Sequence, residues 1–451
     1  MKRLGAVDLT NGKVMLSILR FSWPIFVGNA FQQLYNVVDT AVLGRYADYC
    51  AMASVGLCFP IIVSVIALFC GIGTGTSVIV SRYRGAGENN SIKETILSAW
   101  GIVLVGSIPL ALLGVWNAEV LLQLAGVHEA LIGDAASYLR IYFSASIAVL
   151  GYGINDGILR GLGDSRASLL FLSLSCLINV GLDILLVAGM QFGVVGVAIA
   201  TVLAELAACI LSTGYIFRNY IGKVQSSRAR WHTVKNICAI GLPLGLKQML
   251  FAAGVIMVQM VINRCEPSFI AGFNAASKID MFAALPIQSF SVAMMTFIGQ
   301  NIGARKEDRI YIGIKEALKL SLMVDVVLVV LIMTFAPQLL RLFNSDPSVI
   351  AGGLAYLYRI MPFYVIYTVT SLIQSVLNGL GNVLVSTLIM SGAQWLGRVP
   401  AAWLLYKLCS PENIYFCYGI GWIIELSCLV AYIVIGLYGK RLKSKLGETK
   451  R

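Results

Sequence analysis

The sequence predicts an all-α integral membrane protein with twelve transmembrane helices in two six-helix lobes. Its 451 residues are 58% apolar and only 12% charged, with a mean hydropathy of +0.82, whereas soluble proteins carry about 25% charged residues. Apolar runs long enough to cross a bilayer, at about 20 residues per crossing, recur along the chain with short polar connections between them. An internal repeat then divides the chain into two halves.

The apolar runs define the spans and the domain organisation. Residues 17–217 form the first lobe and residues 236–438 the second, with a basic linker at 218–235 between them. The segments 1–16 and 439–451 lie outside the spans. The predicted spans are 17–43, 52–80, 95–116, 135–160, 167–188, 194–217, 236–262, 272–299, 312–335, 352–379, 384–407 and 414–438.

Positive charge predicts the orientation of these spans. The net charge is +12, and most Lys and Arg residues fall in alternate connections and in the two terminal segments. Cytoplasmic loops carry such an excess, so we expect a multi-pass protein of the inner (plasma) membrane with both termini in the cytoplasm. The basic character then reflects topology and contact with anionic membrane lipid, and it implies no nucleic-acid partner.

Short segments recur in the two halves in the same order. SRYRGAGENN at 81–90 corresponds to GQNIGARKED at 299–308, and ILRGLGDS at 158–165 corresponds to SVLNGLGN at 375–382. Both pairs are about 218 residues apart, so one register is kept across separate connections. Because six spans is an even number, the lobes have the same orientation and are related by a pseudo-twofold axis along the membrane normal. Parallel repeats of this kind occur among secondary transporters.

Polar residues inside the spans form the candidate site. Asp39 lies in span one, where a carboxylate costs roughly 2.5–3.5 kcal/mol. Asn179 and Asp183 are four residues apart in span five and share one helical face. Thr201 in span six and Asn155 in span four add a hydroxyl and an amide. Two carboxylates with such neighbours can share a proton or bind a small hard cation such as Na⁺ through oxygen.

A second interpretation of the two acids is that they lie near the headgroups and are only solvated, because both are close to span ends. The repeat argues against it. A shift of 218 or 219 residues places an apolar residue opposite each acid, Met257 or Val258 for Asp39 and Ala401 or Ala402 for Asp183. The acids are therefore not part of the framework that both halves share.

Several segments resemble the multidrug and toxic compound extrusion (MATE) family, in its bacterial form, and the resemblance covers essentially the whole chain. They are LYNVVDTAVLGRYAD at 34–48, ILRGLGDS at 158–165, INVGLDILL at 178–186 and SKIDMFAALPIQSFSVAMMTFIGQNIGA at 277–304. The resemblance implies export of organic cations and other drugs, driven by inward proton or sodium flow. It also assigns the coupling acid to Asp39, further ion ligands to Asn179, Asp183 and Thr201, and a helix-bending proline to Pro24, which lacks an N–H.

The substrate cavity is expected to draw on polar, acidic and methionine side chains of both halves. The candidates are Gln32, Asn36, Glu205, Met257, Gln259, Met260, Met281, Gln288 and Glu425. Some family members carry further acids in spans seven and ten, and this chain has none there. The roles of Lys247, Asp280, Asp325 and Arg398 stay open between substrate contact and helix packing.

We therefore expect an antiporter that exchanges small organic, mostly cationic, substrates for H⁺ or Na⁺ and that works as a monomer. The alternative is a flippase for a lipid-linked saccharide or another amphipathic lipid, which the acidic first half disfavours. An enzyme is not expected, because no HExxH, GxSxG or GxxxxGK[ST] motif occurs and only two histidines are present. No cofactor is expected, apart from Na⁺ as a transported ion.

Overall fold

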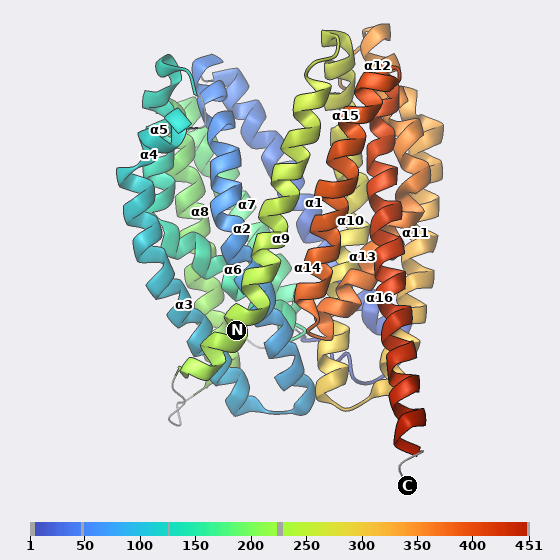
Figure 1. Cartoon of the computed structure of the whole chain (residues 1–451). Helices are drawn as coiled ribbons and strands as arrows, with labels where there is room; N and C mark the ends of the chain where they lie inside the picture. The colour runs from blue at the N-terminus through green and yellow to red at the C-terminus, as the bar shows by residue number, and fades with distance from the viewer. Residues whose placement is uncertain (1–4, 47–48, 125–126, 223–228, 449–451) are drawn as a thin grey trace. The chain divides into compact units, whose positions relative to one another are not determined.

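The computed structural model describes residues 5–46, 49–124, 127–222 and 229–448. Within these ranges the chain is almost entirely helical and forms no β-strand (Figure 1). The predicted all-α class is confirmed.

Helices of the first half follow one another through short connections. They are α1 (Val14–Tyr46), α2 (Tyr49–Ala86), α3 (Asn89–Trp116), α4 (Ala118–Leu124), α5 (Glu129–Ser144), α6 (Ser146–Gly161), α7 (Ser165–Asp183), the π-helix η1 (Ile184–Gly189), α8 (Gly193–Ile216) and the π-helix η2 (Phe217–Ile221).

Helices of the second half repeat this pattern. They are α9 (Trp231–Ile262), α10 (Pro267–Gly303), α11 (Glu307–Arg341), α12 (Pro347–Ile360), the 3₁₀ turn η3 (Met361–Phe363), α13 (Tyr364–Gly379), α14 (Val383–Gly392), the π-helix η4 (Ala393–Arg398), α15 (Val399–Leu408), the 3₁₀ turn η5 (Pro411–Tyr415) and α16 (Phe416–Glu448).

Twelve spans can be assigned to these helices. In the described part of the chain, ten helices are long and apolar enough to cross a membrane. The other two spans are interrupted: α5 and α6 are separated at Ala145, and α14 continues through η4 into α15. The helices extend beyond the predicted limits, because helical hydrogen bonding continues outside the apolar layer. Helix α2, for example, has 38 residues, or about 57 Å at 1.5 Å per residue, against a hydrocarbon core of about 30 Å.

Packing divides the described chain into two compact units. The first comprises residues within Met1–Met249, Val292–Ile314 and Gly379–Gly381, and the second comprises residues within Leu250–Ser291, Lys315–Asn378 and Asn382–Arg451. These units follow contacts and not chain order, so the first half of α9 and the end of α10 belong to the first unit. The predicted lobes, residues 17–217 and 236–438, are each continuous in the sequence, whereas these units are not.

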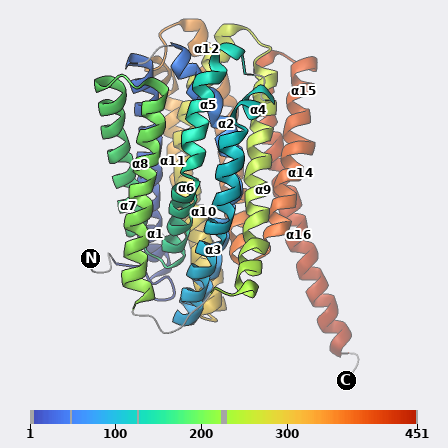
Figure 2. The same cartoon turned by 90° about the vertical axis from the view of Figure 1, so that its left-hand side faces the viewer.

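In the first unit, α2 lies beside α6, α1 beside α7, and α7 beside α8 (Figure 1, Figure 2). Glycines allow α2 and α6 to pack closely. A Cβ added to Gly157 of α6 would lie 2.2 Å from the carbonyl oxygen of Gly73 in α2, so the two backbones touch without side chains between them. Apolar side chains such as Ile72, Ile96 and Ile158 fill the space around this contact.

The recurring segments that reveal the internal repeat pack against each other within the first unit. A Cβ added to Gly85, at the end of α2, would lie 1.8 Å from the Gln300 carbonyl oxygen of α10. One added to Gly303 would lie 1.9 Å from the Arg82 carbonyl oxygen. Arg82 also donates a hydrogen bond of 3.0 Å to the carbonyl of Gly379.

The segment before α1 is held against the same helix ends. Leu9 is fully buried, and its N–H donates to Gln300 Oε1 at 3.1 Å. The Arg309 guanidinium donates to the carbonyls of Leu9, Asn11 and Gly12 at 2.7–3.1 Å. We call residues 5–13 the N-terminal strap, because side chains of α10 and α11 form hydrogen bonds with its backbone.

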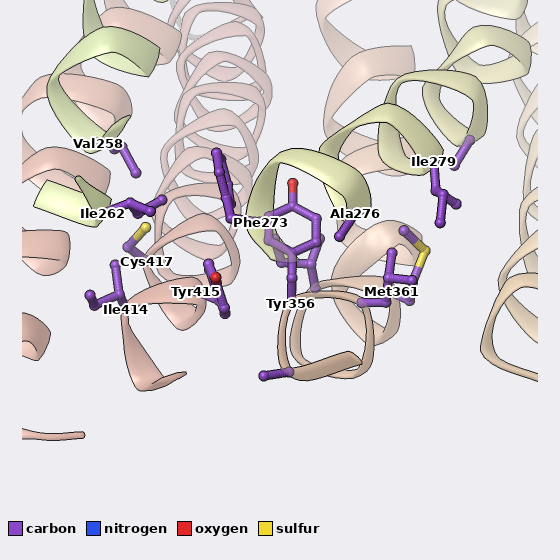
Figure 3. Packing of buried hydrophobic residues seen from close by; sticks show 14 of the residues in the cluster. Val258, Ile262, Phe273, Ala276, Ile279, Tyr356, Met361, Ile414, Tyr415 and Cys417 are labelled. Atoms are coloured by element: carbon purple, nitrogen blue, oxygen red, sulfur yellow. The ribbon is translucent and has the colours of Figure 1, made fainter. Parts of the chain in front are cut away.

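The core of the second unit contains a group of packed aromatic rings among aliphatic side chains (Figure 3). The Tyr415 ring stacks on Phe269 at 5.1 Å and meets the edge of Tyr356 at 5.0 Å, while Phe273 packs against both tyrosines. These rings come from α10, α12 and η5, so one stacked group joins three elements that are far apart in sequence.

Candidate functional site

Asp39 of α1 and Asp183 of α7 form the centre of the candidate site. Asp183 is fully buried and is the last residue of α7, at the point where the helix widens into η1. Such π-helical turns are frequent at functional sites. Asp39 is half-buried, and its carboxyl group lies within hydrogen-bonding reach of that of Asp183. Both helices belong to the first unit and pack side by side.

The oxygens around this pair lack hydrogen-bond donors. Asp39 Oδ1, Asn179 Oδ1 and both carboxyl oxygens of Asp183 are buried and have no hydrogen-bond partner among the described residues. Two ionised carboxylates only accept hydrogen bonds, and an unpaired buried charge is costly. The arrangement therefore requires either a proton on one carboxyl group or a cation among the oxygens.

Thr201 of α8 completes the group. The Asn179 amide donates to Thr201 Oγ1 at 3.4 Å, which turns the Asn179 oxygen away from that hydroxyl. Asp39, Asn179, Asp183 and Thr201 were predicted to act together, and the structure brings these four residues together on three packed helices.

Two tyrosines at this site were missed by the sequence reasoning. The hydroxyls of Tyr35 on α1 and Tyr138 on α5 lie within hydrogen-bonding reach of Thr201 and interact with Asp39 and Asp183. Tyr35 precedes Asp39 by four residues and so shares its helical face, a signal that could have been used. No spacing in the sequence distinguishes Tyr138 from the other aromatic residues of the spans.

Asn155 forms its hydrogen bonds with residues outside the group of Asp39, Asn179, Asp183 and Thr201. Its amide accepts from Trp100 Nε1 at 3.1 Å and donates to Ser212 and Thr213 at 2.9 and 2.8 Å. The helical rotation of α6 directs Asn155 toward α3 and α8, and its hydrogen bonds are satisfied there. These hydrogen bonds connect α6 to α3 and α8, and a part of Asn155 in ion coupling stays a prediction.

A second acidic group lies in the same unit. Asp156 forms an ion pair of 2.8 Å with Arg160 and accepts a hydrogen bond from Ser168. Glu205 interacts electrostatically with Asp156, and its Oε2 is buried with no partner among the described residues. Glu205 follows Thr201 by four residues and so lies one turn from the candidate site.

The predicted substrate-cavity residues fall in both units. Gln32 and Glu205 belong to the first unit, and the side chain of Asn36 lies outside the described residues. The others belong to the second unit, where Gln259 donates to Asn263 at 2.7 Å and Glu425 accepts from Gln374. Met257 is half-buried, and Met260, Met281 and Gln288 are exposed.

The charged residues of the second unit differ in their surroundings. Arg398 is 4% exposed, and its guanidinium lies 4.9 Å from the Tyr418 ring centre and 5.5 Å from that of Trp422. Tyr364 donates a hydrogen bond of 2.5 Å to Asp280. Asp325 Oδ2 is buried with no partner among the described residues. Lys247 belongs to the first unit, whereas Asp280, Asp325 and Arg398 belong to the second.

Helix α1 continues past Pro24 from Val14 to Tyr46. Proline cannot donate to the carbonyl four residues earlier, so the carbonyl of Arg20 loses its helical partner at this point. Bending of α1 at Pro24 stays a prediction.

The fold is that of a multi-pass membrane protein, because ten helices in the described part of the chain are long and apolar enough to cross a membrane. The MatE family model matches residues 24–185 and 243–404, so it covers most of the chain and finds each half of the internal repeat. The chain belongs to the MatE family, a family of multidrug efflux transporters.

Relatives and solved structures agree with this assignment. The chain is 28% identical over 409 residues to the probable multidrug resistance protein YpnP of Bacillus subtilis, covering 89% of this chain and 92% of that protein. It is 26% identical over 360 residues to an FAD transporter of Shewanella oneidensis, covering 77% and 78%. The outward-facing structure of a multidrug resistance MATE family transporter superposes with a TM-score of 0.87 at 24% identity, covering 99% of this chain and all of that one. This likeness shows the shared fold of twelve transmembrane helices in two lobes.

Proposed function

We propose that the protein is a secondary active exporter that exchanges organic, mostly cationic, substrates for H⁺ or Na⁺ by alternating access. The observation that carries this proposal is the group of buried oxygens on Asp39, Asn179 and Asp183 that have no donors. A proton or a sodium ion is the missing partner that such oxygens need. Both termini are placed in the cytoplasm by the distribution of Lys and Arg.

Coupling requires that the ion bind one conformation better than the other, because equal affinity shifts no equilibrium. An ion bound between Asp39 and Asp183 removes the repulsion between their carboxylates. Helix α1 can then repack against α7, with Pro24 as the point of bending. This change would displace substrate from the first half of the chain.

The names of the relatives support a multidrug substrate range. One relative is named an FAD transporter, so an anionic aromatic nucleotide is a second candidate cargo. The buried Arg398 among the rings of Tyr418 and Trp422 offers a positive charge and aromatic faces of the kind that would suit such a molecule.

The test is substrate uptake into inside-out proteoliposomes that contain the purified protein. A proton gradient and a sodium gradient are imposed separately, with an organic cation and with FAD as substrates. Uptake that follows one gradient identifies the coupling ion. Absence of uptake of either substrate under both gradients would contradict the proposal and would favour a lipid-linked cargo.

Two variants make this test specific. Asp39→Asn should abolish gradient-driven uptake. Asp134→Asn removes an exposed carboxylate from α5 and should leave uptake unchanged. If both variants behave alike, Asp39 has no special part in coupling.

A further inference from the structure

A cavity of 650 Å³ lies beside the N-terminal end of α1 within the first unit. The strap and the first two turns of α1 form most of its wall, and Arg166 of α7 also lines it. A second cavity of 340 Å³ continues along α1 and shares Arg20 and Arg166 with the first. The two cavities together form one site with a polar part and an apolar part.

The polar part carries unpaired positive charge. Lys13, Arg20 and Arg166 line it and are exposed, and in the described part of the chain no carboxylate forms an ion pair with any of them. Asp8 is the acidic residue of the wall. Its carboxylate already accepts from the Thr10 N–H and hydroxyl and from the Asn11 amide at 2.6–2.8 Å. The cavity is thus suited to an anion with several oxygens, such as a phosphate group.

The apolar part adjoins Arg20 and Arg166, which line both cavities. It is lined by Leu19, Trp23 and Pro24 together with the stems of Arg20 and Arg166, and Trp23 is 64% exposed. Arg20 of α1 is followed by Trp23 and Pro24 at helical spacing, so this face of α1 changes from charged to apolar within about 6 Å of helix. This order matches a headgroup followed by a hydrocarbon chain.

We propose that this site binds an anionic glycerophospholipid, with its phosphate between Arg20 and Arg166 and an acyl chain along Leu19 and Trp23. Basic pockets at the cytoplasmic ends of transmembrane helices recognise such headgroups, and the distribution of charge places this end of α1 at the cytoplasmic surface. A free phosphate would satisfy the arginines but would leave the apolar part uncovered.

The position of the site suggests that a bound lipid restrains the segment of α1 before Pro24. Arg20 is four residues before Pro24, and its carbonyl has lost its helical hydrogen bond there. A lipid that holds the Arg20 side chain against Arg166 ties the segment of α1 before Pro24 to the start of α7. Binding therefore stabilises one position of this segment.

The test is native mass spectrometry of the full-length protein in detergent, with dioleoylphosphatidylglycerol or dioleoylphosphatidylcholine added. We expect one phosphatidylglycerol molecule to be retained in preference to phosphatidylcholine. Arg20→Gln and Arg166→Gln should each weaken its retention by about fivefold, from the contribution of one basic residue to lipid attraction. Arg45→Gln, which removes an exposed arginine at the other end of α1, is the matched control and should have no effect.

Further arms distinguish the outcomes. Arg20→Lys and Arg166→Lys keep the charge and provide folded variants if the glutamine forms are unstable; they should retain more lipid than the glutamine forms. Trp23→Ala should weaken lipid retention without creating a preference for phosphatidylcholine. Equal retention of both lipids, equal loss in Arg45→Gln, or displacement of the lipid by millimolar inorganic phosphate would overturn the proposal.

Discussion

Asp39 on α1 and Asp183 on α7 hold their carboxyl groups within hydrogen-bonding reach of each other, although three of their four oxygens are buried and have no donor. Two such groups cannot both be ionised at low cost in a buried site. The pair is therefore stable only with a proton or a cation, and its occupancy can control how α1 packs on α7.

Removing the hydroxyl of Tyr138 should weaken ion binding without removing a charge. The Tyr138 hydroxyl lies within reach of Thr201 and helps to orient that hydroxyl toward the site. Tyr138→Phe should raise the ion concentration needed for half-maximal transport by about five- to tenfold, the equivalent of one hydrogen bond. The same protein should reach normal rates at saturating ion. Tyr432→Phe changes an exposed ring and serves as the control, and an equal effect there would refute the assignment.

Asp164 should act as a structural centre of the first unit. It caps α7 through the Ala167 N–H at 3.2 Å and accepts from the hydroxyls of Tyr215 and Tyr220 at 2.7 and 2.8 Å. Tyr215→Phe should lower the free energy of unfolding by about 1.5–3 kcal/mol, because a buried carboxylate loses a donor. Thermal or denaturant unfolding in detergent measures this change, with exposed Tyr358→Phe as the control.

The close contact at the end of α2 should not tolerate a methyl group. Gly85→Ala would place Cβ 1.8 Å from the Gln300 carbonyl oxygen, so the ends of α2 and α10 must separate. We expect a lower unfolding temperature and faster labelling of a cysteine introduced at Ser81. Gly101→Ala in α3 meets nothing within 4 Å and should stabilise its helix by about 0.5–1 kcal/mol. If the two variants are equally stable, the contact does not restrict this end of α2.

The strap should loosen in acid. Burial raises the pKa of Asp8, but hydrogen bonds from Thr10 and Asn11 and the charge of Arg84 outweigh it and lower the pKa below its ordinary value of 3.8. A carboxylate with a lowered pKa stabilises the folded strap above its unfolded pKa, and this contribution is lost as the pH falls through the lower, folded value. The protection of the Thr10 amide against hydrogen exchange, measured relative to the intrinsic exchange rate at the same pH, should fall below about pH 4. In Asp8→Asn this protection should be low at every pH; a pH profile of protection like that of the wild type would show that Asp8 is not responsible.

Much of this arrangement could be predicted from the sequence. A carboxylate is rare in a membrane span, so Asp39 and Asp183 were conspicuous, and the i,i+4 spacing placed Asn179 beside Asp183. The family match to both halves agrees with the repeat that GLG at 161–163 and 379–381 revealed.

Other features depended on information that a sequence lacks. Hydropathy identifies a span but not its rotation, so the partners of Asn155 could not be foreseen. Tyr138 acts at the site because α5 packs on α8, and a tyrosine in a span fits a lipid-facing position equally well. The strap has no regular pattern, and its binding to Arg309 follows from long-range packing alone.

If Asp39 carries the coupling ion, its neutralisation should separate substrate exchange from ion-driven transport. Proteoliposomes containing Asp39→Asn are assayed for substrate exchange at equal concentrations on both sides, and for accumulation against a substrate gradient when the ion gradient is imposed. We predict that exchange persists while ion-driven accumulation is lost. Accumulation at the wild-type level in this variant would show that Asp39 is not the coupling residue.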